Sequence, residues 1–276
     1  MHFPKSLQAY TAIIKATSRP AVLFRPERGA TNARESKLGG TPYFPWDYNA
    51  DYPKHPAQGM RWTPWPKHPT TGRELQLLLQ INFADVPVSD PFPASGILQL
   101  FVDDEEWHDL GDSVRAVYHQ DVSVEAYDFS DVPTDGFHVS EAGLVFEQEH
   151  EFITLSDFRF DAVYSAPIFE GHSFREFSRL HEWKPGRDYQ SITSLRYRDD
   201  FDLGRGRNKL GGYHFSQNHR DPRTELEAWH DSVLLVQFQD YGVLSWGDGG
   251  SAQFFIKTHD LENRDFSDLL FHWDST

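Results

Sequence analysis

Two His-Glu pairs are the closest approach of this chain to a metal-dependent catalytic motif. His150-Glu151 and His181-Glu182 both begin like the zinc-binding His-Glu-x-x-His helix, but neither has a second histidine four residues after the first. The Gly-x-Ser-x-Gly turn of serine hydrolases is missing, and the absence of cysteine removes thiolate nucleophiles and thiolate metal ligands. We therefore expect no metal, no cofactor and no catalytic residue that a motif identifies.

A run of four carboxylates, Asp103-Asp104-Glu105-Glu106, could supply general acid and base groups. Such work requires a pKa near the working pH, which usually comes from burial. Because the run lies in a polar stretch directly after an apolar segment, we expect it to form a solvated loop.

Two glutamines interrupt apolar segments in the same way. Gln80 lies within Leu77–Ile81, and Gln237 lies within Leu234–Phe238. A buried amide without hydrogen-bond partners costs about 1–3 kcal/mol, so each side chain needs a partner. The partner is either the backbone of a covering loop, which we favour, or a ligand or water in a cleft.

A Lys-Leu-Gly-Gly motif also occurs twice, at 37–40 and at 209–212. Consecutive glycines allow positive φ and the close approach of another segment, as a turn before a strand requires. Their amides could instead form a small anion nest with Lys37 or Lys209, and 204–208 adds two arginines beside the second copy. The spacing matches neither a P-loop nor a dinucleotide fingerprint, which favours the turn.

The segment from Thr41 to Thr70 contains seven prolines, a density that excludes helix interiors and central strands. We expect a long, stiffened loop, and loops of this length are often functional. Tryptophan is enriched at binding hot spots, so its three tryptophans, Trp46, Trp62 and Trp65, are candidate partner-binding residues.

A second glycine-rich segment, Ser245–Gly250, contains Asp248-Gly249 between two apolar runs. This pattern predicts a tight hairpin turn, because Asp-Gly suits the positive φ angles that such turns need. Asp248 could also bind a hard cation, although the further oxygen ligands of a calcium loop are missing. The candidate ligand- or partner-binding residues are therefore Trp46, Trp62, Trp65, Gln80, Lys209, Gln237, Trp246 and Asp248.

The elements that must position these residues are mostly strands. Apolar runs and rough alternation predict strands at 21–24, 75–83, 97–102, 114–119, 144–155, 233–238, 253–257 and 268–273. Spacings of three and four residues predict a helix at 4–16 and partial helix within 158–180.

Three matches in the same order indicate an internal duplication. They are the Lys-Leu-Gly-Gly turn, the glutamine-containing strand, and Gly96–Val102 with its counterpart Gly250–Ile256. We expect an α+β, strand-rich, pseudo-twofold fold with peripheral helices. It would form one globular domain, 1–276, built of two related units at about 21–120 and 200–276 and joined by a less regular middle segment.

Charge and composition exclude some classes of partner. The net charge of −16 argues against binding to nucleic acid, since the field of the whole molecule would repel a phosphate backbone. Between Arg115 and Arg159 there are ten acidic residues and no lysine or arginine, which suits either a solvated face or docking of a basic partner. The lack of cysteine, leader pattern and long apolar stretch predicts a cytoplasmic protein without membrane contact.

Several motifs occur in a fixed order along the chain, at 17–20, 37–43, 78–83, 92–101, 246–250 and 260–268. Together they resemble those of the bacterial YwqG-like family, whose proteins carry a domain of unknown function. The resemblance implies a cytoplasmic, α+β, internally duplicated protein, and it implies no activity, cofactor or catalytic residue. The tryptophan-containing loop looks longer here than in the family.

The sequence therefore predicts a non-enzymatic module that binds an unidentified protein or small ligand. A narrower version is an immunity-type inhibitor that covers a basic partner. The alternative is an enzyme whose site lies in the cleft between the two units, since such interfaces commonly hold ligands.

Overall fold

The fold is described from a computed structural model of the chain. The structure describes residues 5–45, 65–87, 90–103, 113–127, 139–164, 208–216, 218, 220–240 and 245–275. Trp46, Trp62 and the part of the predicted helical segment beyond residue 164 lie outside the described residues.

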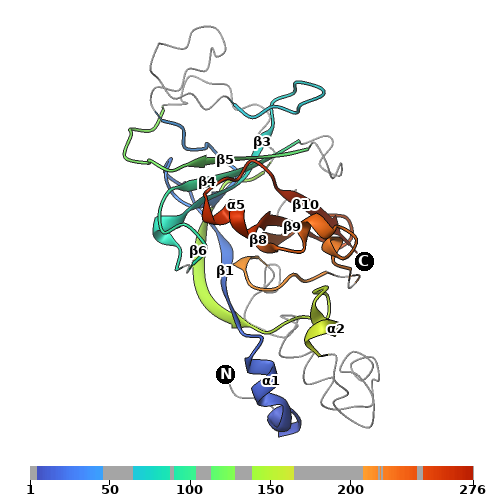
Figure 1. Cartoon of the computed structure of the whole chain (residues 1–276). Helices are drawn as coiled ribbons and strands as arrows, with labels where there is room; N and C mark the ends of the chain where they lie inside the picture. Colours follow the sequence, from blue (N-terminus) through green and yellow to red (C-terminus); the bar gives the residue numbers. More distant parts are fainter. Residues whose placement is uncertain are drawn as a thin grey trace.

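The described strands form one antiparallel sheet in the order β10-β9-β8-β7-β1-β6-β2-β3-β4-β5 (Figure 1). The strand-rich fold that the apolar runs predict is confirmed, and the ends of β4 and β5 agree with the prediction. The strands are β1 (Arg19–Arg28), β2 (Lys37–Leu38), β3 (Gln76–Asn82), β4 (Ile97–Val102), β5 (Val114–His119), β6 (Ala142–Glu151), β7 (Lys209–Gly211), β8 (Ser232–Gln239), β9 (Ser251–Lys257) and β10 (Leu270–Asp274).

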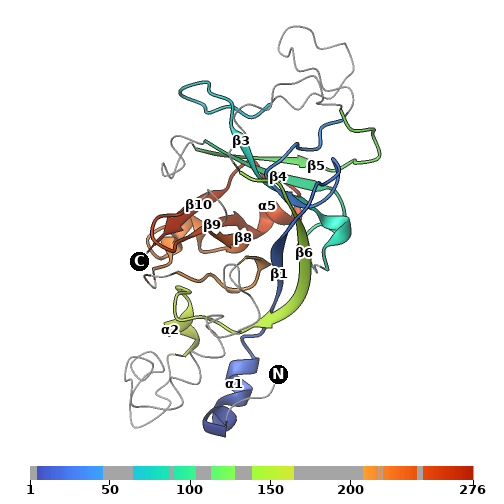
Figure 2. The same ribbon diagram turned by 180° about the vertical axis from the view of Figure 1, so that it is seen from behind.

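Helices in the described part of the chain are short and peripheral. The predicted N-terminal helix is present as a 3₁₀ turn, η1 (Lys5–Tyr10), that continues into α1 (Thr11–Lys15). Figures 1 and 2 place α1 and α2 (Phe160–Val163) at one end of the molecule, away from β3, β4 and β5. α5 (Thr258–Glu262) follows β9 directly. None of the helices described is long and apolar enough to cross a membrane.

The central pair β1 and β6 separates two sets of strands that are paired alike. We call β2–β5 the N-terminal set and β7–β10 the C-terminal set. Lys37 lies opposite Gln80 and Lys209 lies opposite Gln237. Each glutamine in turn lies opposite another glutamine, Gln99 in β4 or Gln253 in β9. Each set also has a register shift in the strand that carries the glutamine, between Leu77 and Leu79 or between Leu234 and Val236.

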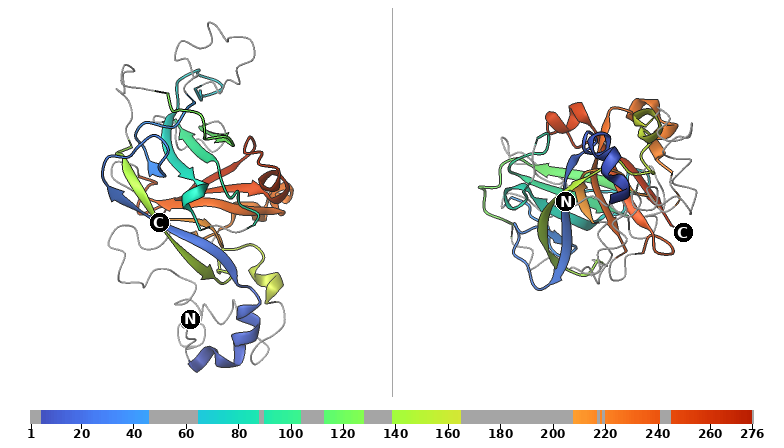
Figure 3. Two further views of the ribbon diagram at one scale, coloured as in Figure 1. Left: turned by 90° about the vertical axis from the view of Figure 1, so that its left-hand side faces the viewer. Right: turned by 90° about the horizontal axis from the view of Figure 1, so that it is seen from below.

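One hydrophobic core joins the two sets. Its buried members include Leu79 and Leu98 from the N-terminal set together with Val236 and Phe254 from the C-terminal set. Because one apolar cluster draws on both sets, the sheet must fold around it. Figure 3 shows β3 and β4 as a layer beside β8 and β9, with the long strands β1 and β6 running past both.

The alternation of side chains along each strand decides the face of the sheet to which the two glutamines point. Leu79 and Ile81 both point into the shared core, so Gln80 between them points to the opposite face. Val236 and Phe238 place Gln237 in the same way. Both amides therefore face the loops that cover the outside of the sheet and not the space between the two sets.

The prediction of a tight hairpin turn at Asp248-Gly249 is wrong. β8 ends at Gln239 and pairs with the start of β9 at Ser251, so 240–250 connects the two strands. Trp246 lies in this connection. Its side chain is fully buried, 5.5 Å from Phe238 and 5.9 Å from Phe271 between ring centroids.

Backbone conformation and lack of space both require glycine in the first Lys-Leu-Gly-Gly turn. Gly39 has a φ of 52°, and an added Cβ would lie 2.1 Å from the carbonyl oxygen of Val139. Gly72 also has a positive φ, 72°, but has open space around it. Gly39→Ala and Gly72→Ala should thus share a backbone cost of about 1–2 kcal/mol, and only the former adds a steric clash.

We expect Gly39→Ala to lower the free energy of unfolding by about 1–3 kcal/mol more than Gly72→Ala, a typical cost of overpacking. Urea unfolding of both variants followed by circular dichroism measures the difference. Equal losses would show that the turn at Gly39 can move away from Val139.

Candidate functional site

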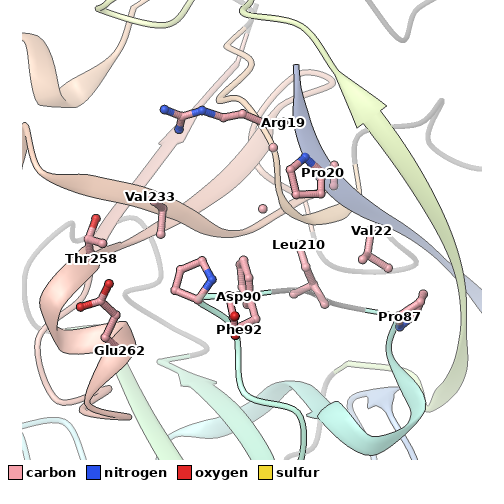
Figure 4. Close-up of a pocket in the computed structure, with 14 residues that line it drawn as sticks. Arg19, Pro20, Val22, Pro87, Asp90, Phe92, Leu210, Val233, Thr258 and Glu262 are labelled. Atoms are coloured by element: carbon pink, nitrogen blue, oxygen red, sulfur yellow. The ribbon is translucent and has the colours of Figure 1, made fainter. Parts of the chain in front are cut away.

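A pocket of about 480 Å³ lies where β1 and the C-terminal set meet the loop that follows β3 of the N-terminal set (Figure 4). The start of β1, the loop after β3, the turn after β7, β8 and α5 all contribute to it. Its volume falls in the range of small-molecule sites, which are mostly apolar with a few polar groups. The apolar walls are formed by Pro20, Val22, Pro87, Phe92, Leu210 and Val233.

The second Lys-Leu-Gly-Gly turn forms part of this pocket because its glycines let other segments come close. Gly211 has a φ of 69°. A Cβ added to it would lie 3.3 Å from Phe92 Cε2 and 3.4 Å from the carbonyl oxygen of Pro20. The turn therefore holds the loop after β3 against the start of β1, and this contact closes one side of the pocket.

Among the described residues, three that are ionisable line the pocket. Arg19 begins β1, Asp90 lies in the loop after β3, and Glu262 ends α5. Arg19 is partly exposed, while Asp90 and Glu262 are exposed. Thr258 also lines the pocket, and the four-residue spacing from Thr258 to Glu262 puts both on one face of α5. The Arg19 guanidinium lies 4.9 Å from the centre of the Tyr213 ring.

Lys209 lies beside this pocket and stabilises the turn. Its Nζ lies 2.8 Å from both carboxylate oxygens of Glu151 and donates to the carbonyl of Tyr213 at 2.6 Å. Glu151 also accepts a hydrogen bond from the Tyr213 backbone N–H. Lys209 is 1% exposed and its charge is balanced by Glu151, so its contacts are those of a structural ion pair. Glu151 of the His150-Glu151 motif is thus engaged in this pair.

Lys37 makes the corresponding contacts in the first turn. Its Nζ donates to the carbonyls of Asn32 at 2.7 Å and Thr41 at 2.8 Å. Desolvation by burial lowers the pKa of Lys37 to about 8, although the nearby carboxylates of Glu141 and Glu35 act in the opposite direction. Both lysines therefore tie the turn to the backbone four residues ahead.

Gln80 and Gln237 also bind backbone groups. Gln80 accepts from the N–H of Tyr43 at 2.7 Å and donates to the carbonyls of Ala33 and Glu35, each at 2.8 Å. Gln237 accepts from the N–H of Phe215 at 3.1 Å. The contacts of Gln80 match the loop-backbone interpretation, whereas Gln237 Nε2 is buried without a hydrogen-bond partner among the described residues. Neither glutamine lines the pocket.

The two described tryptophan candidates pack against buried aromatic residues, Trp246 fully and Trp65 partly buried. Trp65 stacks on Phe44 with ring centroids 5.5 Å apart, and its Nε1 donates to the carbonyl of Leu75 at 3.1 Å. Trp246 is in the shared core, as described above. Asp248 is exposed in the connection between β8 and β9. The structure does not bring these three residues together, and none of them lines the pocket.

Asp103 corrects the expectation that the acidic run is solvated. It is 1% exposed and forms a two-pronged ion pair with Arg73, whose Nη2 and Nε lie 3.0 and 3.2 Å from Asp103 Oδ2. The sequence does not reveal the charged partner of Asp103, because Arg73 lies thirty residues earlier in the chain. The other three carboxylates of the run lie outside the described residues.

A buried ionic cluster supports the C-terminal set. Arg223 is 1% exposed; its Nη2 lies 2.7 Å from Asp221 Oδ2 and 3.4 Å from Asp157 Oδ2. Arg159 also binds Asp157, at 2.6 Å. The pKa values of Asp157 and Asp221 are lowered because hydrogen bonds and charge from these arginines outweigh desolvation.

Two buried histidines lie on the outer faces of the two sets. His214 has Nδ1 3.7 Å from Asp221 Oδ2, and His119 has Nε2 3.1 Å from Gln99 Oε1. Desolvation by burial lowers the pKa of each to about 4. Neither of these histidines lines the pocket.

Metal binding finds no support in the described part of the chain. No group of three or more His, Asp or Glu side chains there could hold a metal ion. The pocket walls, by contrast, went unrecognised in the sequence. The Gly-Gly motif lies in the pocket, and three segments that resemble the YwqG-like family, 17–20, 92–101 and 260–268, contain Arg19, Phe92 and Glu262, but none of these signals pointed to a pocket.

Comparison with known proteins identifies a family without assigning an activity. A family model described as a domain of unknown function, DUF1963, matches residues 36–275. The match covers all the described strands except β1. No curated protein matches the chain.

Proposed function

We propose that this chain, which belongs to the DUF1963 family, binds a small and largely apolar ligand in the pocket between its two strand sets. The observation that carries the proposal is the pocket itself. Its volume of about 480 Å³, apolar walls and few ionisable groups match the general composition of ligand sites.

Binding accounts for the pocket better than catalysis does. Catalytic acids and bases usually lie in the site with pKa values displaced by burial or charge. In the described residues, the buried lysine and histidines with strongly lowered pKa values, Lys37, His119 and His214, lie away from the pocket. The groups that do line it can orient a ligand without taking part in a reaction.

We also propose that the two strand sets arose by duplication, as the repeated motifs predict. The supporting observation is that Lys37 and Lys209 occupy the same register position opposite a glutamine. On this proposal the pocket lies at the junction of two related units. The YwqG-like motifs lie almost entirely within the span that the family model matches, which supports placing the chain with that group.

Filling the pocket tests the proposal. Val233 is partly buried in β8 and points into the pocket in Figure 4, so Val233→Trp should occupy it. The anionic dye anilinonaphthalene sulfonate, whose aromatic rings fluoresce in apolar surroundings, serves as a probe, and its fluorescence titration measures affinity. We expect Val233→Trp to weaken dye binding by about tenfold or more, a loss of about 1.4 kcal/mol or more.

The matched control is Val145→Trp. Val145 lies in β6, is 38% exposed and does not line the pocket. This control should bind the dye as wild type does, with circular dichroism showing that both variants fold. Equal binding by wild type and Val233→Trp, or no binding by wild type, would contradict the proposed function.

A further inference from the structure

The charges that line the pocket are of both signs and are uncommitted. In the described part of the chain, neither Arg19, Asp90 nor Glu262 forms an ion pair or a side-chain hydrogen bond. The Arg19 guanidinium lies over the face of the Tyr213 ring, a contact that leaves its N–H edge available. This differs from the interior, where the charged side chains of Arg223, Lys209 and Asp103 are all paired.

Two of the ionisable residues lie toward one side of the pocket, and most of the apolar residues lie toward the other. In Figure 4, Arg19 extends along the top of the pocket toward the side on which Thr258 and Glu262 lie, beside Val233. Val22, Leu210 and Pro87 lie on the other side of the view, and Asp90 lies between the two sides, beside Phe92. A ligand that fills the pocket therefore meets Arg19 and Glu262 toward one end and mostly hydrocarbon toward the other.

We propose that the ligand is a small apolar zwitterion of the amino-acid or dipeptide type. Its carboxylate would bind Arg19, its ammonium group would bind Glu262 or Asp90, and its apolar side chain would lie against Phe92, Leu210 and Val22. This inference rests on the proposed function and adds the chemistry of the ligand to it.

The pairing of opposite charges is what favours a zwitterion. An anionic ligand would satisfy Arg19 but would bring its charge near two carboxylates, and a cationic ligand would do the reverse. A zwitterion compensates both signs through charge-assisted hydrogen bonds, which are about twice as strong as neutral ones. The guanidinium also suits a carboxylate, because its planar N–H fork can bind both oxygens.

A series of four peptides separates the two charges. Leucyl-phenylalanine carries both; its N-acetyl form lacks the ammonium group, its C-terminal amide lacks the carboxylate, and the doubly blocked form lacks both. Calorimetric titration at pH 7 measures their affinities. We expect the free dipeptide to bind tightest and each block to weaken binding by about tenfold, as for loss of a charge-assisted contact.

Two variants test which pocket residue binds each end of the peptide. In Arg19→Gln, amidation of the peptide carboxylate should no longer weaken binding, whereas acetylation of the ammonium group still should. In Glu262→Gln, acetylation should reduce the affinity by less than it does in wild type, and amidation should reduce it by the same factor as in wild type. Glu147→Gln, on the exposed part of β6, is the matched control and should reproduce the wild-type series. Thermal unfolding of every variant confirms that it is folded.

The outcomes distinguish this inference from the proposed function. If all four peptides bind equally, or if none binds while the dye still binds in a manner sensitive to Val233→Trp, the zwitterion assignment is wrong and the pocket remains a ligand site. If neither peptides nor dye bind, both proposals fail. Selectivity for the free dipeptide that neither Arg19→Gln nor Glu262→Gln changes would also overturn the assignment.

Discussion

Replacing Arg223 with methionine is expected to lower the free energy of unfolding by about 3–5 kcal/mol, as removal of one partner from a buried ion pair does. The Arg223 guanidinium is 1% exposed and donates to Asp221 through Nε at 2.9 Å and Nη2 at 2.7 Å. It also donates to the carbonyl of Ser232 at 3.2 Å and lies 4.5 Å from the centre of the Phe255 ring. Methionine keeps part of the packing but leaves the Asp221 carboxylate without its main charged partner.

Urea unfolding at pH 7, followed by tryptophan fluorescence, measures this loss. Arg25→Met is the control, because Arg25 pairs with Glu27 on the surface, where both side chains are about half exposed. Such pairs contribute about 0–1 kcal/mol, so this variant should lie close to wild type. If Arg223→Met loses no more stability than Arg25→Met, the buried ionic cluster does not stabilise the fold.

Acidification from pH 6.5 to pH 4 is expected to destabilise the protein strongly, before its structural carboxylates become protonated. His119 and His214 each have a folded-state pKa of about 4, below the ordinary value of 6.5, because burial disfavours the charged ring. Between these values the unfolded chain binds more protons than the folded one, so stability falls as the pH falls. Each histidine should account for a loss on the order of 3 kcal/mol across this window.

The carboxylates act in a separate pH range. Asp157 and Asp221 have pKa values below their ordinary 3.8. The contribution of these two carboxylates to the stability of the fold is therefore present above pH 3.8 and is lost as the pH falls further. The pKa of His272 is also lowered by burial, which adds to the loss between pH 6.5 and 4.

Urea midpoints at pH 7, 6, 5 and 4.5 test the histidine contribution. His119→Gln and His214→Gln should each flatten the dependence of stability on pH, whatever their effect at pH 7. His150→Gln, on the exposed part of β6, should leave the slope unchanged. A wild-type protein that is equally stable at pH 7 and pH 4.5 would show that both histidines become charged without unfolding the chain.

Local patterns account for much of the secondary structure. The apolar runs at 97–102 and 114–119 became β4 and β5 with the expected ends, since the pattern of a strand is a property of neighbouring residues. The Gly-Gly turns and the buried glutamines were likewise recognisable, because positive φ and an amide in an apolar strand each demand a particular environment.

Which side chains reach a common cavity was decided by the order of strands in the sheet. The pairing of β7 with β1 brings Gly211 beside Ala21, 190 residues earlier in the chain. The folding of the sheet around one core brings Phe92 and α5 to the same place.

Residue type alone therefore identified side chains that need a particular environment, but it did not show whether each one binds a ligand or stabilises the fold. Trp246 and Lys209 were selected as candidates for binding because tryptophan and lysine often bind partners, whereas their contacts are a buried core and an ion pair with Glu151. The amino-acid sequence by itself determined most of the strands, the positive φ of the two Gly-Gly pairs and the need of each buried polar group for a partner. Only the tertiary structure decided which partner each group found and where the pocket lies, because both depend on contacts between residues far apart in the chain.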